Sequence, residues 1–74
     1  MPKYPVYLTH NDGTIFVTSP DFPELSAFGD TEYDALSHAV SAFREAIAAR
    51  RAQGRAVPPP SEQLDGQKIV DVPE

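Results

Sequence analysis

Apolar and polar side chains alternate along the first part of the chain, and this alternation predicts two β-strands. In residues 4–10, Tyr4, Val6 and Leu8 would share one face and the residues between them the other, which is the two-residue period of a strand. β-Forming side chains return in residues 14–18, after a turn-forming Asn-Asp-Gly sequence. We therefore expect an antiparallel hairpin.

Two closely spaced prolines, Pro20 and Pro23, follow the hairpin. Each fixes its own φ and restricts the residue before it, so the second strand must end there and the chain must turn. Residues 24–28 can then return as a short third strand that Gly29 ends. Three consecutive antiparallel strands would form a meander.

Residues 31–53 carry a helical pattern, in which apolar positions recur at intervals of three and four. Thr31 with Asp34 approximates a capping box at the start, and Gly54 is placed to follow the last turn. At 1.5 Å per residue, the predicted helix is about 34 Å long. The apolar stripe consists of Ala35, Leu36, Ala39, Val40, Phe43 and Ile47.

Beyond the helix, three prolines at positions 58–60 predict a stiff polyproline II connector, and the β-branched residues 68–72 predict a final strand. The order β-β-β-α-β indicates an α+β fold with two layers, in which one long helix covers one face of the sheet. The other face has no helix to cover it. Tyr7, either Ile15 or Phe16, and part of the final strand should therefore face water or a second subunit.

Length and charge narrow the classes of function. A chain of 74 residues without cysteine is expected to form a single domain, residues 1–74, whose small core favours a homodimer or a larger homo-oligomer. Eleven acidic against six basic residues give a net charge of −5, which opposes nucleic-acid binding and favours a basic protein partner. Since no apolar run suits a membrane span or a signal peptide, we expect a cytoplasmic protein.

Candidate catalytic groups have weak support in the sequence. The aspartates fall mainly in turns or at the predicted helix start, where they have structural roles, and neither His10 nor His38 has a nearby Ser or Cys arrangement. No phosphate-binding glycine loop, dinucleotide motif or CxxC pair occurs. We therefore expect no enzymatic activity, no metal and no cofactor.

The aromatic and acidic segment 20–25 has two interpretations. Phe22 and Leu25 could anchor a basic partner, because the prolines stiffen the segment and carboxylates flank it. Alternatively, Phe22 folds back over the end of the helix and belongs to the core. The second interpretation is slightly favoured.

The order of these motifs resembles that of a known family. S-P-D-F-P-E-L after the hairpin, F-G-D-T-E-Y-D-A-L-S-H-A at the helix start and V-P-P-P-S after the helix are similar to the N-terminal domain of HicB antitoxins, over nearly the whole chain. The departures are Glu24-Leu25, where the family usually has a glycine after the second proline, Asp34 in place of a common glutamate, and the tripled proline.

The resemblance implies a partial RNase H-like fold, with the final strand beside the first and without nuclease activity. It also implies an antitoxin that binds a small, basic, mRNA-cleaving HicA-like toxin and covers its RNA-binding and catalytic surface. We place the candidate toxin contacts in the 21–25 loop and at the helix start. They are Asp21, Phe22, Glu24, Glu32 and Tyr33.

Many members of this family carry a DNA-binding segment after the domain. This chain ends at Glu74 without such a segment, so we expect no direct DNA binding from it. Two alternatives to the antitoxin remain open. One is a divergent RNase H-like remnant that binds or cleaves nucleic acid, and the other is an orphan oligomeric adaptor.

Overall fold

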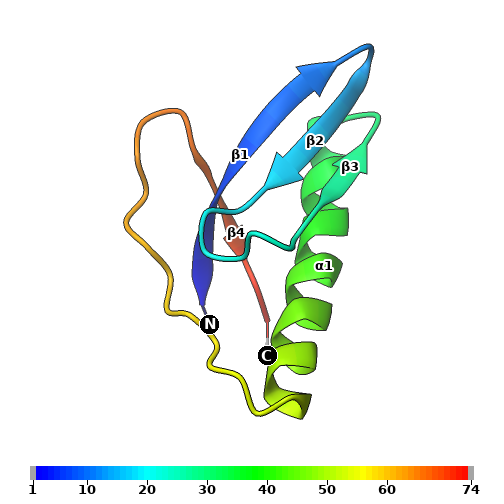
Figure 1. Ribbon diagram of the computed structural model, residues 1–74. Coiled ribbons are helices and arrows are strands. Elements are labelled where there is room, and N and C mark those ends of the chain that lie inside the picture. Colours follow the sequence, from blue (N-terminus) through cyan, green and yellow to red (C-terminus); the bar gives the residue numbers. More distant parts are fainter. Residues whose placement is uncertain (1, 74) are drawn as a thin grey trace.

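A long α-helix lies across one face of a four-stranded antiparallel sheet in the computed structural model, which describes residues 2–73 (Figure 1). The strand order is β3-β2-β1-β4, so the meander is followed by a last strand placed beside the first. The predicted α+β, two-layer β-β-β-α-β fold is confirmed. The elements are β1 (Lys3–Asn11), β2 (Thr14–Thr18), β3 (Ala27–Gly29), α1 (Glu32–Ala52) and β4 (Lys68–Asp71).

The β1–β2 hairpin forms where the turn sequence predicts it. Asn11 pairs with Thr14, which leaves Asp12 and Gly13 as a two-residue loop. Both loop residues have positive φ, 51° and 81°, as a type I′ turn requires, and the twist of that turn matches the twist of the strands.

Strand β4 pairs with the first half of β1, and the pairing explains how Pro5 fits inside a strand. Val72 N–H donates to Pro2 C=O at 2.9 Å, and hydrogen-bonded pairs alternate along an antiparallel ladder. Pro5, opposite Ile69, therefore occupies a pair that exchanges no hydrogen bonds. Its missing N–H costs the β1–β4 ladder nothing.

Strand β3 is shorter and later than the expected strand 24–28. Leu25 N–H donates to Phe22 C=O at 2.9 Å, so residues 22–25 form a turn and pairing with β2 begins only at Ala27. Gly29 belongs to the strand because α1 starts directly over it. A Cβ there would lie 2.5 Å from the backbone nitrogen of Ala35, which is closer than any side chain allows.

The helix has the predicted boundaries. The Thr31 hydroxyl accepts a hydrogen bond from Asp34 N–H at 3.1 Å, Gln53 is the C-cap, and Gly54 follows it with φ of 70°. The acidic first turn and the basic last turn suit the helix dipole. The buried stripe consists of Ala35, Ala39, Phe43 and Ile47.

Three aromatic rings form the centre of the core. Tyr4 from β1 stacks on Phe43 from α1 with ring centroids 5.0 Å apart, and Phe22 meets both rings edge-on at 5.1 and 5.4 Å. Such arrangements are favourable beyond their buried area. The Tyr4 hydroxyl donates to Pro58 C=O at 2.8 Å, so the buried ring also holds the connector that follows the helix.

The sheet face opposite α1 is partly apolar, as the alternation predicts. The sequence did not decide whether Ile15 or Phe16 faces outward. Ile15 is buried beneath the helix, and Phe16 is half-buried on the outer face. Phe16 lies opposite Phe28 on this outer face, with ring centroids 6.1 Å apart. Tyr7, Phe28 and Ile69 are all exposed.

Candidate functional site

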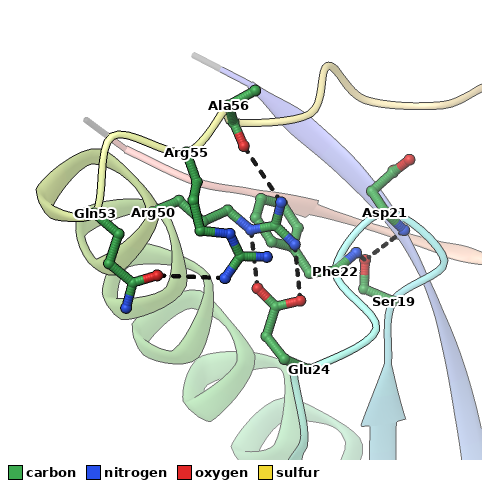
Figure 2. Close-up of polar contacts among 8 residues, drawn as sticks. All are labelled: Ser19, Asp21, Phe22, Glu24, Arg50, Gln53, Arg55 and Ala56. Carbon is green, nitrogen blue, oxygen red and sulfur yellow. Dashed lines mark hydrogen bonds and ion pairs between the residues drawn. The ribbon is translucent and has the colours of Figure 1, made fainter.

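The proline loop, residues 19–25, is folded tightly onto the rest of the protein (Figure 2). The buried Ser19 side chain accepts hydrogen bonds from the backbone N–H groups of Asp21 and Phe22, both at 3.2 Å. A serine that bonds the backbone two and three residues on stabilises a turn. This turn directs the Phe22 ring inward.

Phe22 has no exposed surface at all. Of the two interpretations, the one in which Phe22 folds back over the helix is therefore confirmed. The buried ring has no surface that a partner protein could contact. The Arg50 guanidinium lies 4.9 Å from its centroid, in the range of a cation–π contact.

Glu24 is held by Arg50, which comes from the last turn of α1. Arg50 Nε and Nη2 each donate to a Glu24 carboxylate oxygen at 2.9 Å, and Nη1 donates to Ala56 C=O at 3.3 Å (Figure 2). The hydrogen bonds from Arg50 lower the pKa of the Glu24 carboxyl, and the same pair raises the pKa of Arg50. One guanidinium thus joins the proline loop, the helix end and the connector.

Asp21 makes a second junction between the proline loop and the connector. Its two carboxylate oxygens accept from the backbone N–H of Ser61 at 3.1 Å and from the Ser61 hydroxyl at 2.6 Å. Ser61 directly follows the three prolines. The aspartate of the loop and the serine of the proline-serine element are therefore bonded partners, although 40 residues separate them.

The helix start is a more open surface. Tyr33 is 79% exposed, and Glu32 contacts Lys68 Nζ at 3.6 Å while both side chains remain about half exposed. Asp30 and Asp34 are also exposed. Exposed ion pairs contribute little to stability, so Glu32 and Tyr33 are accessible to a partner at little cost.

The five candidate contacts therefore lie in two places. Asp21, Phe22 and Glu24 gather near the C-terminal end of α1, and Glu32 and Tyr33 lie at its N-terminal end. Eighteen residues from Glu32 to Arg50 correspond to about 27 Å along the helix axis. The two groups do not form one continuous site.

Arg50 and Ser61 are the polar residues that sequence reasoning did not connect to the loop. Their partners, Glu24 and Asp21, are 26 and 40 residues away, so no local spacing reveals them. The family pattern carries the available signal, because it contains both the aspartate of the loop and the later proline-serine element.

Within residues 2–73, no three His, Asp or Glu side chains come close enough together to hold a metal ion. The carboxylates are distributed over turns, caps and the ion pairs described above. In the same part of the chain, no helix combines the length and the apolarity that crossing a membrane requires.

Comparison with known proteins places this arrangement in a family. The protein shares its fold with the antitoxin HicB of Burkholderia pseudomallei, whose crystal structure it matches with a TM-score of 0.80 at 21% sequence identity. The match covers 99% of this chain and 63% of that one. No curated protein sequence matches the chain. Residues 3–74 match the family described as HicB_like antitoxin of bacterial toxin-antitoxin system, and the chain belongs to this family.

Proposed function

We propose that this protein is the antitoxin of a HicA/HicB-like toxin-antitoxin system and that it acts by binding its toxin rather than by catalysis. The observation that carries the proposal is the family match over residues 3–74, together with the HicB fold. By the same resemblance, the toxin is a small, basic, mRNA-cleaving HicA-like protein. We place its neutralisation in the cytoplasm, where mRNA is found.

The charge distribution supports a basic partner. The chain has a net charge of −5, and Asp30, Glu32 and Asp34 are exposed together around the start of α1. Complementary fields speed association between two proteins and help to select the right partner. An acidic helix start suits a toxin whose own surface binds the phosphates of RNA.

We propose the helix start as the toxin-binding surface, with Glu32 and Tyr33 as contacts. An exposed aromatic ring beside carboxylates can supply both apolar area and charge to an interface. The Asp21 and Glu24 side chains are bonded to Ser61 and Arg50. In this proposal they act indirectly, by holding the proline loop in shape.

The decisive experiment mixes the protein with a small basic HicA-like protein, which is sought in the adjacent reading frame, and follows cleavage of an RNA substrate. Excess antitoxin should abolish cleavage, and the two proteins should elute together as a stable complex. Full toxin activity at excess antitoxin would count against the proposal. Metal-dependent cleavage of an RNA–DNA hybrid by this chain alone, lost in Asp21→Asn, would favour the nuclease remnant instead.

A matched pair of charge reversals tests the location. Asp30→Lys with Glu32→Lys should weaken toxin binding by about tenfold or more, mainly through slower association. Glu62→Lys with Asp65→Lys makes the same change in net charge on the exposed connector and should cost about threefold or less. Equal losses in the two double variants would place the toxin on another surface.

We also propose that residues 1–74 fold as one domain and that the protein forms a homo-oligomer. One cluster of buried residues joins all four strands and the helix, which supports a single folding unit. The small size of that core supports association.

A further inference from the structure

A groove with two arginines lies beside the C-terminal half of α1. The segment that follows β4 runs along this half of the helix, and the groove lies between the two (Figure 1). It is open to solvent and has a volume of about 180 Å³. Helix positions spaced three and four residues apart share one face, and this face supplies most of the lining. The lining residues are Arg44, Ile47, Ala48 and Arg51 from α1, with Val72 and Pro73 from the segment.

This arginine groove has an apolar floor and two cationic ends. Buried Ile47 and Val72 form the floor, and the exposed Ala48 is too small to fill the space above them. Arg44 and Arg51 are exposed and lie seven positions apart, which corresponds to about 10 Å along the helix axis. The groove can therefore hold one apolar side chain between two guanidinium groups.

The arginine groove is positive in a protein that is acidic as a whole. The chain has a net charge of −5, yet none of the described residues that line the groove is acidic. Glu45 follows Arg44 but lines a neighbouring hollow. The nearby Arg50 is bonded to Glu24 in the proline loop. The groove therefore suits an anionic group, whereas a basic toxin would meet like charge there.

We propose that the arginine groove binds an extended acidic segment of a partner protein other than the toxin, in which one apolar residue stands between two carboxylates. The apolar side chain rests on Ile47 and Val72. In an extended chain, the residues before and after it are about 7 Å apart, which is within reach of the long side chains of Arg44 and Arg51. A guanidinium group can hold a carboxylate through two parallel hydrogen bonds.

The size and charge of the groove distinguish this occupant from two others. Small-molecule sites usually have volumes of about 300–1,000 Å³ and enclose most of their ligand, whereas the arginine groove is smaller and open. A nucleic acid would bring phosphates to the arginines, but the acidic excess of the chain opposes a phosphate track. A narrow apolar floor between two cations matches an acidic peptide better than either.

This site lies beyond the surface proposed for the toxin. Tyr33 precedes Arg44 by eleven residues, which corresponds to about 16 Å along the helix axis. The two surfaces share no residue, so the proposal allows the toxin and the acidic segment to be bound together. The protein would then bring its toxin to a second partner.

Two five-residue peptides with blocked ends test the proposal on the full chain. G-E-L-D-G has the proposed pattern, and G-K-L-K-G keeps the apolar residue but reverses the charge. In an NMR titration, the acidic peptide should shift backbone amides of α1 between Arg44 and Arg51 and that of Val72, and it should bind at least about tenfold more tightly than the lysine peptide. Equal affinities, or shifts centred elsewhere, would overturn the proposal.

A matched pair of substitutions tests the location. Ala48→Glu puts a carboxylate on the groove between the two arginines, and Ala49→Glu makes the same change at the next residue, which does not line the groove. Binding of the acidic peptide should weaken by about tenfold or more in Ala48→Glu, because the new carboxylate competes for the arginines, and by about threefold or less in Ala49→Glu. Equal losses would contradict the location. Both alanines are exposed and glutamate is a good helix former, so both variants should fold.

The double variant Arg44→Gln with Arg51→Gln separates this proposal from the proposed function. It should bind the acidic peptide about tenfold or more weakly and still inhibit the toxin within about threefold of the wild type. Loss of toxin inhibition in this folded double variant would assign the groove to the toxin and overturn the proposal. Peptide binding by a wild type that does not inhibit the toxin would support the groove and remove the proposed function.

Two other occupants are tested with the same double variant. A single-stranded oligothymidylate that binds the wild type more tightly than the peptide, and binds the double variant poorly, would assign the arginines to nucleic acid. The connector of this chain also has an apolar residue near carboxylates, since Leu64 is 59% exposed and lies near Glu62 and Asp65 in sequence. Self-association that is lost both in the double variant and in Leu64→Ser would assign the groove to a second copy. Either result would overturn the proposal.

Discussion

The two edges of the sheet, β3 and β4, differ in how their outward-facing backbone groups are covered. At β3, His38 of α1 lies with its Nδ1 2.6 Å from Phe28 C=O, and since a carbonyl only accepts, that nitrogen donates. The helix start also packs directly on Gly29. At β4, Ile69 and Asp71 turn their backbone groups outward beside an open groove.

This difference follows from chain connectivity. Strand β3 leads into α1 after only two residues, so the first turns of the helix must lie against that strand. Strand β4 comes after a connector of fifteen residues, from 53 to 67, and reaches the sheet on the far side of β1. Proteins generally cover or shorten exposed edges. Here the chain itself covers one edge, and within residues 2–73 no strand pairs with the other.

The largest effect is expected from proline at Val70 in β4. Val70 is buried and bonds across to Tyr4, so Val70→Pro removes a ladder bond and leaves a buried carbonyl unpaired. We expect a loss of about 3 kcal/mol in the free energy of unfolding. Ile69→Pro should lose less than about 1 kcal/mol. Urea denaturation of both variants measures the difference, and equal losses would show that the assigned alternation is wrong.

The covered edge can be forced open at Gly29. In Gly29→Ala the new Cβ would lie 2.5 Å from Ala35 N and 2.8 Å from the Asp34 carbonyl carbon. Because these are backbone atoms, the helix start must move, at a cost of about 2 kcal/mol. Gly54→Ala is the control: nothing lies within 4 Å, and only its φ of 70° is unfavourable, which costs about 1 kcal/mol. Chemical denaturation measures both free energies of unfolding. A larger loss in Gly54→Ala than in Gly29→Ala would contradict the close packing of α1 on Gly29.

Removing the His38 side chain tests the same edge more gently. His38→Ala frees Phe28 C=O from its partner, with an expected loss of about 1 kcal/mol. Heteronuclear NMR should show the shift changes centred on β3. His10→Ala changes an exposed histidine of β1 and is the control. Shift changes that spread equally in both variants would argue against a specific bond at β3.

The smallest effect concerns pH. Arg50 lowers the pKa of Glu24 in the folded protein, so this pair contributes stability above the unfolded pKa of glutamate and loses it as the pH falls through the lowered value. Thermal melts of wild type and Glu24→Gln should therefore differ near neutral pH and converge in acid. The Glu24 side chain is 45% exposed although that of Arg50 is only 14% exposed, so high salt should also reduce the difference. If the melting temperatures of the two proteins differed by the same amount at every pH, the ion pair would not contribute to the pH dependence of stability.

The local elements of the fold could be predicted from the sequence because their signals are local. Asp12 and Gly13 specify the turn, Thr31 caps the helix, and Gly54 follows its end. Family resemblance supplied the place of the last strand beside the first. The burial of Phe22 was the favoured of two interpretations, and the structure selects it.

The candidate site was less predictable because its geometry depends on distant contacts. The sequence gives no sign that Asp21 and Glu24 have bonded partners. Their partners, Ser61 and Arg50, are 40 and 26 residues away along the chain. The expected strand from residue 24 was wrong at its start for the same reason, since the turn at Phe22 and Leu25 delays pairing. The toxin contacts at the helix start stay a prediction.

Amide hydrogen exchange along β4 tests the contrast between the edges most directly. Val70 bonds to β1 and should be protected at every protein concentration. Ile69 and Asp71 direct their N–H groups away from β1 and should exchange rapidly. Protection of all three amides would contradict an open β4 edge.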